Sequence, residues 1–247
     1  MSEWFKEVVL KTTDGVSYPG VRIPPCPLSF MQNLILNQME VGPMENFIYF
    51  IGDKATGEVA VIDPAWDVKF LLDNAKKNNL SIKAVLVTHG HFDHTNGVEE
   101  LLKTLDIPVY VNEKEVDFFK FNWGSENIKK TKSGDKLKIG NIEIRFVHTP
   151  GHTPGSQCFL INNNLVSGDT LFINGCGRCD LPGGNAEEMF DTICNKLMKM
   201  PDNTVVFPGH NYADKKYDEL KNQKQTNPYM QYDNLMAFVG RRLPRLN

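Results

Sequence analysis

Four short segments rich in apolar residues are each followed at once by a polar loop that carries histidine or aspartate. The segments are Ala84–Val87, Ile142–Val147, Leu165–Ser167 and Thr204–Phe207. Their lengths and their content of β-branched residues predict buried β-strands, and the glycines in the loops let the backbone approach closely. Because strand ends at one edge of a sheet lie close together, we expect the four loops to converge.

The remaining pattern predicts a mixture of helices and strands. Asn46–Ile51 and Glu58–Ile62 predict a hairpin, and Val109–Val111 a short strand. Helical spacing of apolar residues predicts helices at 68–78, 98–105, 116–119, 186–200 and around 215–222. Asn96 and Glu99 resemble a capping box that would begin the second of these helices.

The composition narrows the class of protein. With 247 residues, a formal net charge of -3 and a pI near 6.1, the chain lacks the strongly basic character typical of nucleic-acid binding. Five cysteines at scattered positions predict free thiols in a reducing compartment. No apolar run approaches the roughly 18 residues of a membrane span, and the first residues lack the features of a signal peptide. We therefore expect a cytoplasmic protein with neither a nucleic-acid nor a membrane partner.

The segment Thr88–His94 places three histidines and one aspartate directly after the first of the four strands. Neutral imidazole and carboxylate are the usual ligands of zinc and of non-haem iron. In an extended chain alternate residues point the same way, so His89 and His91 would face one point. Asp93 and His94 would share a second point if the chain turns between them. Solvated loop histidines are the alternative, but the density and position of the cluster favour a metal site.

All the histidines except His148 lie in the predicted loops, and we expect His148 to be a neighbour of the site or a packing residue. Two sets of three ligands are available: His89, His91 and His152 for one metal, and Asp93, His94 and His210 for a second. Asp169 is the natural bridge, because paired catalytic metals lie only about 3.5–4 Å apart. Such a pair favours hydrolysis by a metal-bound hydroxide, with Asp93 holding the water or accepting its proton.

Four motifs occur in the order THGHFDH (88–94), TPGHTPGS (149–156), GDTLF (168–172) and PGHNY (208–212). Together they resemble the metallo-β-lactamase superfamily over about residues 46–212. The resemblance implies an α+β fold, a four-layered αββα sandwich, with two zinc ions at the end of its two sheets; iron or manganese are alternatives. Its ligand set agrees with the one above. Asp169 stands where the main subgroup of zinc β-lactamases carries a cysteine, which argues against antibiotic hydrolysis.

The run from Gly168 to Arg178 is similar to the glyoxalase II branch, thioesterases that hydrolyse S-acylglutathione. That resemblance implies that Arg178 and Tyr212 contact the substrate, although Arg178 could instead form a structural ion pair. The branch usually has an aromatic residue where this chain has Asp180, and the segment 178–180 resembles the persulfide dioxygenases, which use a single iron and oxygen. The thiol carrier could therefore be glutathione, coenzyme A or a carrier protein.

We therefore predict a metal-dependent hydrolase of the glyoxalase II type that cleaves a small-molecule thioester. The alternative is a mononuclear iron persulfide dioxygenase acting on glutathione persulfide. A scaffold protein without catalysis is a third hypothesis, but such a protein has no need for seven retained ligand-type residues. Residues 31–212 would form the catalytic domain, with an N-terminal extension over 1–30 and a helical C-terminal segment over 213–247 packed on the same domain. We expect Cys176 and Cys179 to be small loop residues rather than a redox or zinc pair.

Overall fold

The computed structural model describes residues 33–242, and the predicted extension over residues 1–30 lies outside this range. The described chain forms two six-stranded sheets and one short two-stranded ribbon. Sheet A contains, in spatial order, β1 (Leu34–Val41), β2 (Asn46–Asp53), β3 (Glu58–Ile62), β4 (Ser81–Leu86), β5 (Val109–Asn112) and β6 (Ile128–Thr131). Sheet B contains β14 (Asp218–Glu219), β13 (Val205–Pro208), β10 (Asn164–Gly168), β9 (Gln157–Ile161), β8 (Ile142–His148) and β7 (Lys136–Ile139). The ribbon pairs β11 (Leu171–Phe172) with β12 (Gly175–Cys176).

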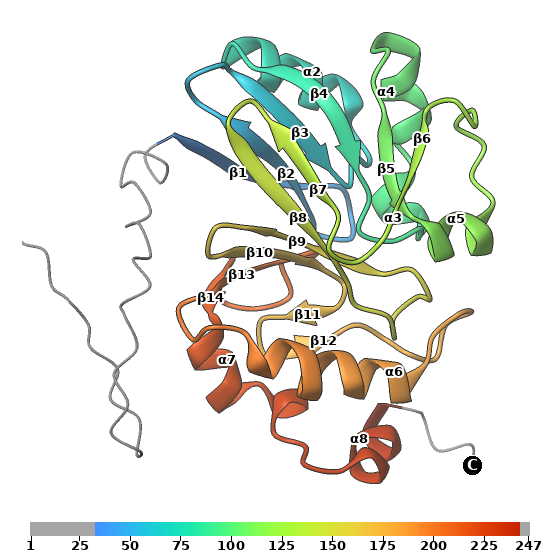
Figure 1. Cartoon of the computed structure of the whole chain (residues 1–247), viewed down its shortest axis with the longest axis vertical. Helices are drawn as coiled ribbons and strands as arrows, with labels where there is room; N and C mark the ends of the chain where they lie inside the picture. The colour runs from blue at the N-terminus through green and yellow to red at the C-terminus, as the bar shows by residue number, and fades with distance from the viewer. Residues whose placement is uncertain (1–32, 243–247) are drawn as a thin grey trace, which may run out of the picture. The chain divides into compact units, whose positions relative to one another are not determined.

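Helices cover the outer face of each sheet (Figure 1). Those on the side of sheet A are α2 (Val68–Lys77), α3 (Phe92–Thr95), α4 (Val98–Thr104) and α5 (Glu113–Phe119). On the side of sheet B, α6 (Ala186–Phe190) continues into a π-helix (Asp191–Lys196) and a 3₁₀ turn (Leu197–Lys199), and α7 (Leu220–Thr226), a 3₁₀ turn (Pro228–Met230) and α8 (Leu235–Arg242) follow. Among residues 33–242, no helix combines the length and the apolar character needed to cross a bilayer.

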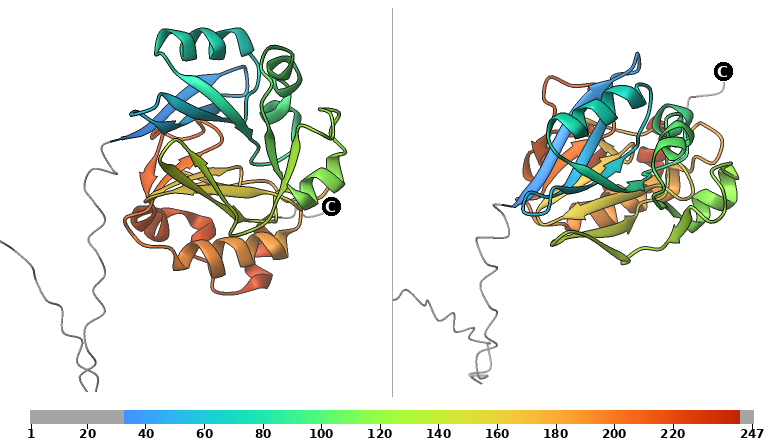
Figure 2. Two further views of the ribbon diagram at one scale, coloured as in Figure 1. Left: turned by 45° about the horizontal axis from the view of Figure 1, so that its top comes forward. Right: turned by 90° about the horizontal axis from the view of Figure 1, so that it is seen from above.

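The strand β2 shows why two layers of sheet form. All of its residues are buried, and they alternate between two cores. Phe47 and Tyr49 pack between the sheets, together with Phe146 and Phe159 of sheet B. Ile48 and its alternate neighbours pack instead under α2 and α4. A strand that is apolar on both faces requires cover on both sides, so the predicted four-layered αββα fold is confirmed, and a turned view shows the same layers (Figure 2).

The four predicted loops converge, but they come from two sheets rather than from one edge of a single sheet. In sheet B, β8 and β10 are both antiparallel to β9, and β13 is parallel to β10. Their carboxyl ends therefore lie at the same edge of sheet B. The fourth loop follows β4, which belongs to sheet A.

Two details of the predicted helices are wrong. Asn96 does not cap α4: its side-chain oxygen accepts a hydrogen bond from the backbone N–H of Trp66 (2.6 Å), and Gly97 stands at the N-cap. Likewise, the helix expected around 215–222 begins only at Leu220, because Asp218–Glu219 pairs with β13 at the edge of sheet B. In both places a contact with a distant segment overrides the local sequence signal.

Candidate metal centre

The loops that follow β4, β8, β10 and β13 bring all seven predicted ligand residues together. Two groups of three have ligand atoms within 4.8 Å of one another: His89, His91 and His152, here called site A, and Asp93, His94 and His210, here called site B. These are the two sets expected from the sequence. A third, overlapping group adds Asp63 to His89 and His94. Asp63 was not anticipated as part of the centre.

In site A the three imidazole rings lie close together, with interplanar angles of 90°, 72° and 78°. The ring centroids of His89 and His91 are 4.8 Å apart, and that of His152 lies 4.7 Å and 4.6 Å from them. The Nδ1 atom of His89 lies 3.1 Å from Oγ1 of Thr88, and Nδ1 of His152 lies 2.7 Å from the carbonyl oxygen of Arg178. Because a carbonyl only accepts, the Nδ1 atom of His152 carries the proton and leaves Nε2 with its lone pair.

The histidines of site B are also oriented by hydrogen bonds from their Nδ1 atoms. His94 donates from Nδ1 to Oδ2 of Asp63 (3.0 Å), and His210 donates from Nδ1 to the carbonyl oxygen of Met44 (2.8 Å). The Nε2 atoms of these two histidines are only 3.1 Å apart, and Oδ2 of Asp93 lies 3.3 Å and 3.4 Å from them. Two neutral rings with protons on Nδ1 would point lone pairs at each other here. A cation at this point would remove that repulsion.

Asp169 lies between the two sites. Its Oδ2 atom is 3.6 Å from Nε2 of His152 and 3.4 Å from Nε2 of His210, and its Oδ1 atom is 3.4 Å from Nε2 of His94. Among the described residues, the buried side-chain atoms without a hydrogen-bond partner are His89 Nε2, His152 Nε2 and Asp169 Oδ1. All of them belong to this cluster, and buried polar atoms are normally satisfied. Imidazole nitrogens and carboxylate oxygens left open in this way fit divalent zinc, iron or manganese.

Burial and neighbouring charges set the protonation of the cluster. Burial, followed by the charges of the neighbouring histidines, lowers the pKa of His89 well below its ordinary value. Burial likewise lowers the pKa of His91 to about 4. For Asp169, burial acts to raise the pKa, but the charges of His94 and His210 outweigh it and lower the pKa to about 2. Site A therefore offers neutral imidazoles at neutral pH, and Asp169 an ionised carboxylate. In site B burial acts to lower the pKa of His94 and of His210, but interactions with Asp169 and other neighbouring groups outweigh it and raise both pKa values. A metal ion at site B would therefore displace a proton when it binds.

Four residues that position the ligands were missed by the sequence analysis: Asp63, described above, and Asn46, Thr88 and Glu115. Asn46 donates from its side-chain amide to Oδ2 of Asp93 (2.9 Å). Thr88 lies between His89 and Asp63, donating from Oγ1 to Oδ2 of Asp63 (2.5 Å). Glu115 is buried beside the loops of site A. Polar side chains at the ends of apolar strands were the available signal for Asn46 and Asp63; Glu115 gave none, because it lies within a helix.

The residues predicted to contact substrate flank the centre. Tyr212 is 55% exposed, and its ring stacks on that of His210 with centroids 4.5 Å apart and an interplanar angle of 9°. Arg178 is exposed, and its guanidinium donates two hydrogen bonds to Asp180 (2.9 Å and 2.8 Å). His148 stands at the end of β8 and belongs to neither group of ligands; its Nε2 atom lies 2.9 Å from the carbonyl oxygen of Pro154.

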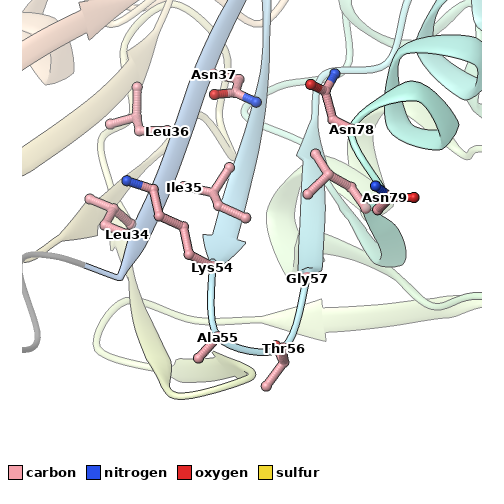
Figure 3. Close-up of a pocket in the computed structure, with 11 residues that line it drawn as sticks. Leu34, Ile35, Leu36, Asn37, Lys54, Ala55, Thr56, Gly57, Asn78 and Asn79 are labelled. Carbon is pink, nitrogen blue, oxygen red and sulfur yellow. The ribbon is translucent and has the colours of Figure 1, made fainter.

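Two further features lie outside the two groups of ligands. Cys176 and Cys179 are buried in the core between sheet B and its helices. A cavity of about 590 Å³ lies at the turn between β2 and β3, lined by Lys54 to Gly57, the start of β1 and Asn78 to Leu80 (Figure 3). Because β3 and β4 begin beside this cavity and end beside the histidines, it occupies the opposite edge of sheet A from the candidate metal centre.

Comparison with known proteins identifies the family and agrees with the observed fold. The model of the metallo-beta-lactamase superfamily matches residues 41–210. A probable polyketide biosynthesis zinc-dependent hydrolase, PksB of Bacillus subtilis (strain 168), is 34% identical over 194 residues, which cover 78% of this chain and 85% of that protein. The hydroxyacylglutathione hydrolase of Shewanella halifaxensis (strain HAW-EB4) is 37% identical over 173 residues, 68% of this chain and 63% of that protein. Among solved structures, ETHE1 from Myxococcus xanthus is similar with a TM-score of 0.75 at 28% identity, covering 85% of this chain and 92% of that one.

Proposed function

The chain belongs to the metallo-beta-lactamase superfamily, and from that premise we propose that it is a metal-dependent hydrolase of the glyoxalase II type that cleaves an acyl thioester. The observation that carries the proposal is the pair of three-ligand groups with Asp169 between them. The buried atoms without a hydrogen-bond partner among the described residues, His89 Nε2, His152 Nε2 and Asp169 Oδ1, belong to the same cluster. His89, His91 and His152 would hold one metal ion, and Asp93, His94 and His210 a second. Likeness to a hydroxyacylglutathione hydrolase supports the choice of a thioester.

Divalent ions bound at these sites would supply an acidified water and polarise the substrate carbonyl. The protein's own groups then orient the reactants. Asp93 is held by the amide of Asn46, and the contact with His94 keeps the pKa of Asp93 well below its usual range although burial acts to raise it. An ionised carboxylate in this position can hold the attacking water by accepting a hydrogen bond from it. The lowered pKa makes Asp93 a weak base, so we assign it the holding of the water rather than the uptake of its proton. The exposed ring of Tyr212 beside His210 offers a face against which a substrate can lie.

For the thiol part of the substrate, we propose a set of three carriers rather than one. Arg178 would attract the carboxylates of glutathione, but its guanidinium already pairs with Asp180, so a glutathione substrate has to compete for it. The likeness to a hydrolase of polyketide biosynthesis supports thioesters of coenzyme A or of a carrier protein as well. Glutathione, coenzyme A and carrier-protein thioesters are therefore the substrates to compare, in a protein that we place in the cytoplasm.

A persulfide dioxygenase is the second candidate function. The likeness to ETHE1 and the Arg178–Asp180 pair favour it. Such an enzyme would hold a single iron ion and consume oxygen, whereas a hydrolase needs no oxygen.

The first experiment is elemental analysis of the purified protein, followed by assays of thiol release and oxygen uptake. We expect close to two metal ions per chain and thiol release from at least one thioester, at an unchanged rate without oxygen. One iron per chain, with oxygen uptake on glutathione persulfide and no thiol release, would establish the dioxygenase instead. The variant Asp73→Asn is the control, because this exposed aspartate pairs with Lys69 on the surface of α2.

A further inference from the structure

Glu115 is a buried carboxylate that the proposed reaction does not use. It lies in α5 and has no solvent-exposed surface. Burying a carboxylate costs free energy unless hydrogen bonds compensate, so such a residue calls for an explanation. The explanation lies in the donors that surround it.

Both oxygens of Glu115 accept hydrogen bonds from the two loops that carry site A. Oε1 accepts from the backbone N–H of Gly90 (2.6 Å), and Oε2 accepts from the backbone N–H of Gly155 (2.7 Å). The hydroxyl of Thr153 lies 2.8 Å from Oε1 and 2.9 Å from Oε2. Gly90 stands between His89 and His91, and Thr153 directly follows His152. One side chain therefore joins the loops that contribute all three histidines of site A.

At Gly90 and Gly155 the backbone of the two loops runs so close to α5 that a side chain at either position would clash. A Cβ atom on Gly155 would lie 2.3 Å from the backbone nitrogen of Glu115, and one on Gly90 would lie 2.4 Å from the ring of Phe119. Phe119, at the end of the same helix, also meets His91 edge to face with ring centroids 5.7 Å apart. The helix α5 thus forms a template against which the loops of site A are fixed.

The donors to Glu115 are neutral amides and a hydroxyl, and their effect on its pKa is opposite to the effect of burial. Burial raises the pKa of Glu115, while the hydrogen bonds from Thr153, Gly90 and Gly155 act to lower it. Backbone N–H groups favour the ionised form, which has no proton to place against them. Replacing this carboxylate by an amide would turn an NH₂ group toward at least one N–H donor and break that contact.

We propose that Glu115 is a positioning residue for site A: by joining the backbone at Gly90 to the segment Thr153–Gly155, it sets the spacing of His89, His91 and His152 for a metal ion. The proposal rests on the metal binding in the proposed function, but not on the thioester. Site B has its own buried acid in Asp63, so the loss of Glu115 weakens metal binding at site A and spares site B.

The test compares cobalt(II) binding to the full chain and its variants, prepared free of metal and titrated against a competing chelator. The visible absorption of bound cobalt(II) reports the coordination of each ion independently of turnover. The variant Glu115→Gln keeps the size of the side chain and removes its charge. Its matched control is Glu113→Gln, which makes the same change in the same helix, at a residue that pairs with Lys132 at the surface (3.3 Å). The variant His152→Ala identifies the binding step that belongs to site A.

We expect two binding steps for the wild-type chain and for Glu113→Gln. In Glu115→Gln the step that His152→Ala abolishes should weaken by about 10–100-fold, with a changed cobalt spectrum, while the other step stays unchanged. Thr153→Val removes one donor and should cause a smaller loss at the same step. If Glu115→Gln does not fold, as judged by near-ultraviolet circular dichroism, Thr153→Val decides the matter.

Unchanged cobalt affinity and spectrum in both variants would overturn the proposal, and so would an equal weakening of both steps. No cobalt binding by the wild-type chain would overturn the proposed function and this inference together. A selective loss at site A in a protein that cleaves no thioester would reject the proposed substrate and leave the role of Glu115 standing.

Discussion

The Oδ2 atom of Asp63 lies 3.0 Å from Nδ1 of His94, and both side chains are buried. The same oxygen accepts a hydrogen bond from the hydroxyl of Thr88 (2.5 Å), which in turn lies 3.1 Å from Nδ1 of His89. Since the hydroxyl proton points to the carboxylate, the hydroxyl oxygen accepts from His89. One carboxylate therefore orients a histidine of site B directly and a histidine of site A through one hydroxyl.

The variant Asp63→Asn should lower metal affinity by about 10–100-fold, because it removes the carboxylate that holds the proton of His94 on Nδ1. Asparagine suits the backbone at this position, where φ is +50°. Isothermal titration of the metal-free protein with zinc measures the change. The control is Asp73→Asn on the surface of α2. Equal zinc affinity in the two variants would show that the hydrogen bond from His94 to Asp63 does not support metal binding.

The variant Thr88→Val should weaken site A by about tenfold, at the lower end of such effects, since Asp63 still holds the backbone N–H of residue 88 at 2.7 Å. His89 would lose the acceptor for its Nδ1 proton, and its ring would be free to change tautomer. Zinc affinity, measured by the same titration, tests this. The control is Thr204→Val, at a buried threonine just before β13, at the end of that strand opposite to His210. An effect confined to site B would show that the hydroxyl does not act through His89.

The variant Asp169→Ala should reduce turnover at least about 100-fold and lower the metal content, because its oxygens lie within 3.6 Å of histidines of both sites. Elemental analysis and thiol release measured on the same preparation separate loss of metal from loss of catalysis. Full activity in this variant would refute the assignment of the centre.

Removal of metal should lower the melting temperature. A metal ion present at about 100 times its dissociation constant adds about 2.7 kcal/mol per site to the free energy of unfolding. Removal would also expose the Nε2 atoms of His94 and His210 to each other at 3.1 Å. Differential scanning calorimetry after chelation, and again after adding zinc, measures the effect; magnesium serves as the control because it prefers oxygen ligands. Identical melting curves with and without zinc would speak against a metal centre.

The thiol of Cys158 should resist alkylation in the folded protein. Burial raises the pKa of this thiol to about 11. At pH 9 about three quarters of an exposed thiol is ionised, but only about one hundredth of Cys158. Because the unfolded chain releases the proton first, this group should also make the free energy of unfolding fall as the pH rises from about 9 to about 11. Mass spectrometry of peptides labelled with iodoacetamide in native and in unfolding buffer checks this, and equal labelling of Cys158 in both would contradict it.

The sequence by itself determined the strands that lead into the candidate ligands, the set of candidate ligands and the family; it missed other strands, such as β1, β6 and β7. The ligands could be identified because each of them lies at or just beyond the end of an apolar strand: Asp169, for example, directly follows β10. The periodicity of the strands and the choice of histidine or aspartate are local properties of the chain, which a pattern can show.

Only the tertiary structure decided how the ligands are oriented and which residues hold them. His210 is fixed by the carbonyl of Met44, 166 positions away, and His152 by the carbonyl of Arg178. Every residue has a carbonyl, so neither partner carries a side-chain signal. Glu115 lies within an ordinary amphipathic helix, and its role appears only when α5 packs against both loops of site A. Such contacts join segments far apart in sequence, and their geometry follows from the packing of the two sheets and their helices.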